Sequence, residues 1–164
     1  KIISNAIATY ERTLISGNSR FDKFYYHGDS NALNSSEIRG LKLFYEDLNC
    51  TSCHSGFNFS NGEIVNIGLY EKYSDIGKMR VSLNESDNGK FKVPTLRNIS
   101  ITYPYMHDGS MKSLEEVVDH YISGGKMNAN KDKRINPLNI SKKEKQDLIA
   151  FLKSLTDSLF IVRW

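Results

Sequence analysis

Several features that mark particular classes of protein are scarce or absent in this sequence. Its 164 residues include three prolines and two cysteines, and they contain no apolar run long enough to span a membrane. Charge of neither sign predominates, because the formal net charge is only +3 and the basic residues are interspersed with acidic ones. Such a mixed charge pattern indicates a solvated surface and gives no support for nucleic-acid binding.

The remaining composition is that of an ordinary soluble globular protein. Hydrophobic residues make up 39% of the chain and charged residues 25%, both close to the average for such domains. A chain of this length can bury one hydrophobic core but hardly two independent ones. The sequence begins with Lys1 in a segment that already has helical spacing, so we expect a processed chain or a piece of a longer one.

The two cysteines stand close together, and a histidine follows them directly. Cys50, Cys53 and His54 form a Cys-X-X-Cys-His motif, which is the attachment signature of c-type haem. The two thiols form thioether bonds to one edge of the porphyrin, and the histidine then lies beneath the iron as its proximal ligand. The motif therefore predicts one covalent haem c, in a periplasmic or other extracytoplasmic compartment.

Two other interpretations of the motif are weaker. A thioredoxin-like dithiol would need a βαβ pattern around it, and none is visible. A zinc site would need further ligands at short paired spacing, but the other histidines (His27, His107 and His120) are scattered and no third cysteine exists. Haem attachment is the interpretation that the residues favour.

The second axial ligand of the iron decides the redox chemistry, since methionine raises the reduction potential and an anionic oxygen lowers it. Spacing alone leaves the choice open. For any single methionine or tyrosine, core packing is the commoner role. The candidates are Met79, Met106, Met111, Met127, His107, His120 and Tyr121.

The apolar spacing predicts a mainly α fold in which helices and long loops wrap around the cofactor. Helices are expected over residues 1–15, 35–48, from 113 to about 122, and from 141 to about 155. Asn34 or Ser35 can cap the second of these, and Ser113 and Ser141 each open a capping box. Residues 55–90 show no sustained period and no convincing strand pair, which is typical of a functional loop.

Three longer motifs carry a family resemblance. They are residues 91–98 (FKVPTLRN), 102–109 (TYPYMHDG) and 113–118 (SLEEVV). With residues 8–14 (ATYERTL), they make the chain similar, over roughly residues 1–156, to the C-terminal haem domain of bacterial di-haem cytochrome c peroxidases and their MauG-like relatives. In that family peroxide reacts at the N-terminal haem, and the C-terminal haem stores and relays electrons.

The resemblance implies a role and an organisation for this chain. It would be an electron-relay domain that passes electrons to a peroxide-reacting haem in another domain, and by itself it would lack the peroxidatic haem. Residues 1–34 would be a linker helix and loop leading from the missing N-terminal haem domain. Residues 35–156 would form the cytochrome c-like haem domain, and residues 157–164 an apolar tail.

The resemblance also implies site residues. The distal iron ligand of the family falls on Tyr121, where typical peroxidases have methionine and MauG-like proteins have tyrosine, with Met127 as the alternative. Backbone carbonyls of Thr102 and Pro104 would contribute to a calcium site shared with the missing domain. Charged side chains would neutralise the haem propionates, and His107 and Asp108 would orient loops near the haem edge. The candidates for the propionates are Lys92 and Arg97.

Other functions remain open at this point. The chain could be a mono-haem electron carrier, or a haem subunit docked on a larger complex through its apolar tail. A self-contained peroxidase would need an open iron site and a nearby acid–base residue, and no residue clearly marks one. The expected partners are the missing haem domain or a partner subunit, and a small redox donor such as a cytochrome or a cupredoxin.

Overall fold

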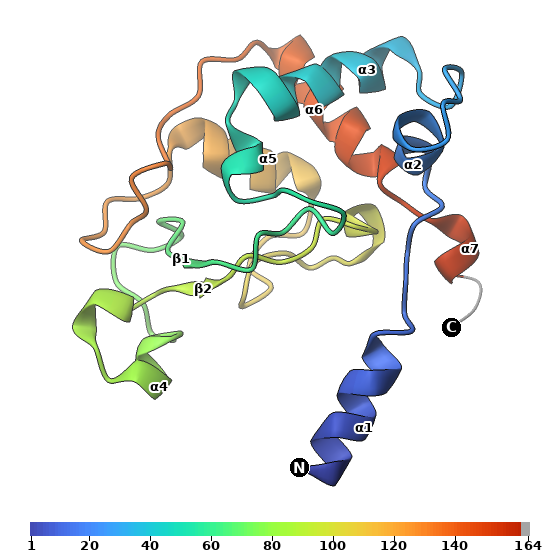
Figure 1. The fold of residues 1–164 in the computed structure, drawn as a ribbon. Coiled ribbons are helices and arrows are strands. Elements are labelled where there is room, and N and C mark those ends of the chain that lie inside the picture. The colour runs from blue at the N-terminus through green and yellow to red at the C-terminus, as the bar shows by residue number, and fades with distance from the viewer. Residues whose placement is uncertain (162–164) are drawn as a thin grey trace.

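A computed structural model describes residues 1–161, and these form a mainly α-helical fold, as the sequence predicted. Figure 1 shows helices above and around long loops, with a short strand pair among the loops. The α-helices are α1 (Ile2–Glu11), α2 (Arg20–Tyr25), α3 (Ser35–Lys42), α4 (Met79–Ser82), α5 (Leu114–Ser123), α6 (Lys142–Ser154) and α7 (Ser158–Ile161). A π-helical turn (Leu43–Asp47) and 3₁₀ turns (Cys50–Ser52, Glu85–Asp87 and Ile99–Ile101) complete the helical elements.

The helix boundaries follow from capping side chains. Asn34 accepts hydrogen bonds from the first turn of α3, and its capping box with Glu37 is complete. Ser141 and Glu144 form the expected box at α6. At α5, Ser113 caps the helix, but the Glu116 carboxylate accepts from Lys112 instead of reaching back to Ser113. Each cap satisfies backbone N–H groups that a helix start leaves unpaired.

Helices α3 and α6 pack against each other at the top of Figure 1. Gly40 permits this contact, because a Cβ atom there would lie 2.0 Å from the backbone oxygen of Asp147. The Asp147 carboxylate binds α3 in return, accepting from Arg39 Nε at 2.7 Å and Nη2 at 2.9 Å, and from the hydroxyl of Ser36. A small residue and an ion pair thus fix the two helices together.

The core beneath this helix pair is rich in phenylalanine. Phe21, Phe44, Phe59 and Phe151 are each at most 2% exposed, and their rings meet mainly edge to face at centroid distances of 5.1–6.3 Å. Such aromatic pairs contribute beyond the area they bury. Because Phe21 belongs to α2, the segment before residue 35 also contributes to the core of the domain.

Two strands pair among the loops, which the sequence did not predict. Strand β1 (Ile64–Val65) is antiparallel to β2 (Phe91–Lys92), with Ile64 opposite Lys92 and Val65 opposite Phe91. Each strand has two residues, too few for an alternating pattern to be read from sequence. The pair ties the start of the long loop to its end.

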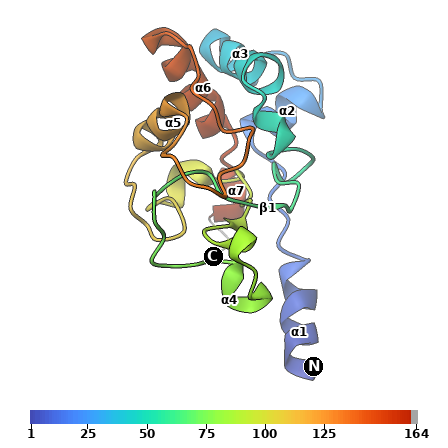
Figure 2. The ribbon, with the colours of Figure 1, turned by 90° about the vertical axis from the view of Figure 1, so that its left-hand side faces the viewer.

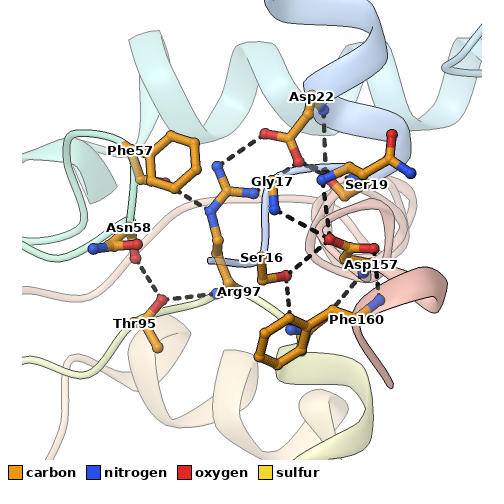
Figure 3. Close-up of polar contacts among 12 residues, drawn as sticks. Ser16, Gly17, Ser19, Asp22, Phe57, Asn58, Thr95, Arg97, Asp157 and Phe160 are labelled. Carbon is orange, nitrogen blue, oxygen red and sulfur yellow. Dashed lines mark hydrogen bonds and ion pairs between the residues drawn. The ribbon is translucent and has the colours of Figure 1, made fainter. Parts of the chain in front are cut away.

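Residues near the two ends of the described chain are tied together beside the core. Asp157 is 3% exposed, and its Oδ2 accepts from the hydroxyl of Ser16 and the backbone N–H groups of Gly17 and Asn18 (Figure 3). Its backbone N–H donates to the side chain of Asn98 at 2.8 Å. This junction fixes the point from which the preceding segment leaves the domain.

Helix α1 projects away from the rest of the molecule in Figures 1 and 2. It has no buried residue, and Ile3 and Ile7 remain exposed. Within residues 1–161 no helix is both long and apolar enough to cross a membrane. Of the expected apolar tail, residues 162–164 lie outside the described residues, and residues 158–161 form α7.

Candidate functional site

The Cys-X-X-Cys-His motif adopts one tight turn. Asn49 precedes it in a left-handed conformation with φ 56°, and Cys50–Ser52 form a 3₁₀ turn. The N–H of His54 donates to the carbonyl of Cys50 at 2.9 Å, which closes the turn. The two cysteines form no disulfide with each other, and burial raises the pKa of the Cys50 thiol to about 12 and also raises that of the Cys53 thiol.

The imidazole of His54 is fixed in one orientation. Its Nδ1 lies 2.9 Å from the carbonyl oxygen of Phe59, and because a carbonyl can only accept, Nδ1 must carry the proton in this contact. The lone pair is then on Nε2. Burial lowers the pKa of His54, against the opposing effect of hydrogen bonds to the Phe59 and Pro94 carbonyls. A neutral imidazole with a held Nδ1 is the form that ligates iron through Nε2.

A cavity of about 430 Å³ adjoins this turn. Its volume falls in the range of cofactor and ligand sites. Most of the side chains that enclose it are apolar and come from the π-helical turn, the long loop, α5 and α6. Those lining it include Phe44, Leu48, Cys50, Cys53, His54, Ile67, Leu69, Val93, Leu96, Met106, Val118, Tyr121, Leu138, Leu148 and Leu152.

Tyr121 reaches this cavity from the last turn of α5. Burial raises the pKa of its hydroxyl, and no hydrogen bond from the described residues opposes that shift. Among the described residues no fully buried side-chain oxygen or nitrogen lacks a partner, so the Tyr121 hydroxyl, which makes no hydrogen bond there, is open to the cavity that Tyr121 lines. An iron ion carried by a bound porphyrin would give this oxygen the partner that the described residues do not supply.

The other candidates for a distal ligand separate into two groups. Met106 and His107 line the cavity together with Tyr121, but the His107 ring stacks on Phe91 with centroids 3.8 Å apart. Met127 is 80% exposed and is not among the lining residues. Of the remaining candidates, His120 holds a loop, with Nε2 3.0 Å from the Ile67 carbonyl oxygen.

The two side chains expected near the propionates differ in position. Lys92 lines the cavity, so its expected role stays a prediction. The expectation for Arg97 was wrong, because its guanidinium is buried in an ion pair with Asp22 and donates to the Phe57 carbonyl. A buried arginine requires such a carboxylate partner. The expected calcium-site residues, Thr102 and Pro104, both border the cavity.

The residues present fit a covalent haem. One apolar cavity joins two thiols, an imidazole whose Nδ1 is held by a backbone carbonyl, and a phenol that has no hydrogen-bond partner among the described residues. A metal ion without a porphyrin finds no comparable site, since among the described residues no cluster of three His, Cys, Asp or Glu side chains could hold one. The donor set and the apolar enclosure match haem ligation.

Sequence reasoning missed one charged residue of the site. Arg134 lines the cavity and donates to the carbonyl of Ser52 at 3.0 Å, inside the haem-attachment motif. It lies some eighty positions further along the chain, in the predominantly basic stretch 131–134 (KDKR). Neither its spacing nor its surroundings in the sequence distinguish it from a solvent-exposed charge.

Comparisons with known proteins identify several relatives. The family model for cytochrome c matches residues 38–156. Cytochrome c551 peroxidase of Nitrosomonas europaea is 39% identical over 158 residues, which cover 94% of this chain and 44% of that protein. The methylamine utilization protein MauG of Methylorubrum extorquens is 37% identical over 155 residues, covering 93% of this chain and 43% of that protein.

A solved structure has the same fold. A MauG-like protein associated with microbial copper homeostasis superposes with a TM-score of 0.82 at 34% identity, covering 89% of this chain and 54% of that one. The chain spans less than half the length of the two curated relatives. Its similarity therefore extends over one part of each of them.

Proposed function

Because this chain belongs to the cytochrome c family and has cytochrome c peroxidases and MauG proteins as relatives, we propose that it is the electron-relay domain of a di-haem peroxidase-like protein. In this role it passes electrons to a peroxide-reacting haem in another domain. The observation that carries the proposal is the apolar cavity that joins the Cys-X-X-Cys-His turn to Tyr121. The resemblance of the whole chain to half of such proteins supports it.

Membership of the cytochrome c family implies a covalent haem c, and we assign its attachment to Cys50 and Cys53. Each thiol would add across one vinyl group of the porphyrin, so that its sulfur bonds to one vinyl carbon and its hydrogen goes to the other. We assign His54 as the proximal ligand through Nε2. Its Nδ1–H is held by Phe59, so the ring needs no reorientation when the iron changes charge.

We assign Tyr121 as the distal ligand. When bound, haem c supplies reversible one-electron transfer. An anionic phenolate stabilises oxidised iron and lowers the reduction potential. The apolar side chains that line the cavity would keep water away from a bound haem, and ligation by both His54 and Tyr121 would leave no position on the iron for peroxide. Such a site exchanges electrons and does not bind substrate.

The second candidate function is a mono-haem electron carrier, or a haem subunit docked on a larger complex. The exposed apolar side chains of α1, Ile3 and Ile7, favour docking on another protein surface. They suit the relay domain equally well, where the surface would belong to a second haem domain. The number of haems in the natural protein separates the two functions.

Further parts of the proposal follow from the relay function. The partners are a second haem domain or subunit and a small redox donor protein such as a cytochrome or a cupredoxin. The compartment is the periplasm or another oxidising space outside the cytoplasm. A calcium ion bound by the carbonyls of Thr102 and Pro104 would complete its ligand shell with oxygens from the second domain.

The test is the haem content of the natural gene product. Intact mass and haem quantitation should give two covalent haems per polypeptide, one of them on a peptide that contains Cys50 and Cys53. One haem would replace the relay function with the carrier function. A chain without covalent haem on this peptide would refute both functions.

A further inference from the structure

Arg134 forms the centre of a charged cluster at the wall of the haem cavity. Its Nε and Nη2 donate to the carboxylate of Asp132 at 2.9 and 2.7 Å, and Nη2 also donates to Glu63 at 2.7 Å. Its Nη1 donates to the carbonyl oxygen of Ser52 at 3.0 Å. Asp132 and Arg134 both line the cavity. We call Arg134, Asp132 and Glu63 the thioether-edge cluster.

Hydrogen bonds connect the cluster to the haem-attachment turn. Ser52 stands between the two cysteines, and its carbonyl accepts from both Arg134 and the side-chain amide of Asn61. The backbone N–H of Asn61 donates to the carbonyl of Cys53 at 2.9 Å. These bonds hold the Arg134 guanidinium, and the two carboxylates paired with it, against the attachment turn beside Cys53.

The cluster carries one more negative than positive charge, because one guanidinium faces two carboxylates. The side chains of Asp132, Arg134 and Glu63 are 21%, 30% and 48% exposed, so water and salt screen the charge of Asp132 least and that of Glu63 most. The oxidised form of a haem bears one more positive charge than the reduced form. Any fixed charge at the cavity wall therefore shifts the balance between the two forms.

We propose that the thioether-edge cluster sets the reduction potential of this haem, with Arg134 as the positioning residue that keeps two carboxylates beside Cys53. The inference rests on the proposed haem attachment. The net negative charge favours the oxidised form, in the same direction as a phenolate from Tyr121. The step involved is the transfer of one electron from a donor to the haem, with no bond broken and no proton moved.

Charge variants of the cluster test the proposal by the order of their potentials. Arg134→Gln makes the cluster more negative, and Glu63→Gln with Asp132→Asn makes it positive. The triple variant is neutral. In mediated spectroelectrochemical titrations of the haem-loaded gene product, the potential should fall in the order double, triple, wild type, Arg134→Gln. Added salt should narrow these differences.

Two controls separate this electrostatic role from a structural one. Lys133 is exposed and adjacent in sequence, so Lys133→Gln removes the same charge and should shift the potential less than Arg134→Gln does. Arg134→Lys keeps the charge and should stay near the wild-type value. A second haem elsewhere in the protein serves as an internal reference that should not move.

The proposal requires that Arg134→Gln and the double variant shift the reduction potential in opposite directions. If Arg134→Gln and the double variant move the potential in the same direction, or neither exceeds Lys133→Gln, the inference is overturned. Should Arg134→Gln fail to fold, the double variant alone decides, because an unchanged or lower potential contradicts the proposal. Absence of covalent haem from the wild-type chain would instead refute the proposed function.

Discussion

Arg97 and Asp22 form a buried, two-bond ion pair between the loop after β2 and helix α2. Nη1 lies 2.8 Å from Oδ2 and Nη2 2.9 Å from Oδ1, and the side chains are 4% and 1% exposed (Figure 3). The guanidinium also lies over the ring of Phe57, with 4.0 Å from its carbon to the centroid. The pair connects the segment before residue 35 to the haem domain proper.

Removing one partner of this pair should be costly. Asp22→Ala leaves the Arg97 charge buried without a carboxylate, and we expect it to lower the free energy of unfolding by about 3–5 kcal/mol. Urea denaturation of the haem-loaded protein measures the loss. The exposed pair of Arg80 and Asp75 is the control, since Arg80→Gln should cost less than about 1 kcal/mol. Equal losses for the two variants would contradict the structural role of Asp22.

The stability that Asp147 gives to the contact between α3 and α6 should depend on pH. Hydrogen bonds from Arg39 and Ser36 lower the pKa of Asp147 from 3.8 to about 2. Because the folded pKa lies below the unfolded one, the stabilisation is complete above about pH 4 and is lost as the pH falls towards 2. Arg39 is half exposed, so we expect Asp147→Asn to cost only about 1–2 kcal/mol at neutral pH.

Urea midpoints of the wild type and of Asp147→Asn, measured from about pH 7 down to about pH 3, check this dependence. The difference between the two proteins should shrink as the pH falls. A difference that stays constant over this range would show that the asparagine acts through packing and not through lost charge.

Gly40 should tolerate no side chain. A Cβ atom there would lie 2.0 Å from the Asp147 oxygen and 2.8 Å from Cβ of Phe151, so α3 and α6 would have to separate. We expect Gly40→Ala to destabilise the fold by about 3 kcal/mol or more, although alanine favours helix by propensity. Ser35→Ala, at an exposed position of the same helix, is the control. Thermal unfolding followed by circular dichroism measures both.

Replacement of Tyr121 should change the iron environment. Under the proposed ligation, Tyr121→Phe removes an iron-bound phenolate, and the absorbance and EPR spectra should change from a six-coordinate to a five-coordinate or water-ligated form. Tyr121→Met should raise the reduction potential, because a thioether stabilises reduced iron better than a phenolate does. Met127→Ala should leave the spectra unchanged, since Met127 is exposed. Unchanged spectra in Tyr121→Phe would contradict Tyr121 as the distal ligand and would favour Met106, which also lines the cavity.

The sequence by itself determined several features of this protein. The attachment motif, the helix starts at Ser113 and Ser141 and the mainly α class are local properties, because caps and periodicity act within a few residues. The long motifs at residues 91–118 indicated the relationship to peroxidases and MauG proteins, which the comparisons confirm.

Only the tertiary structure decided how distant residues combine. In the folded chain Arg97 pairs with Asp22 and does not line the cavity. Arg134 donates to the carbonyl of Ser52. Tyr121 lines the cavity, whereas Met127 is exposed to solvent. Each of these outcomes depends on packing between segments far apart in the chain. A charged or aromatic residue has the same local signal in each setting, and its partner across the fold determines whether it is structural, exposed or part of the site.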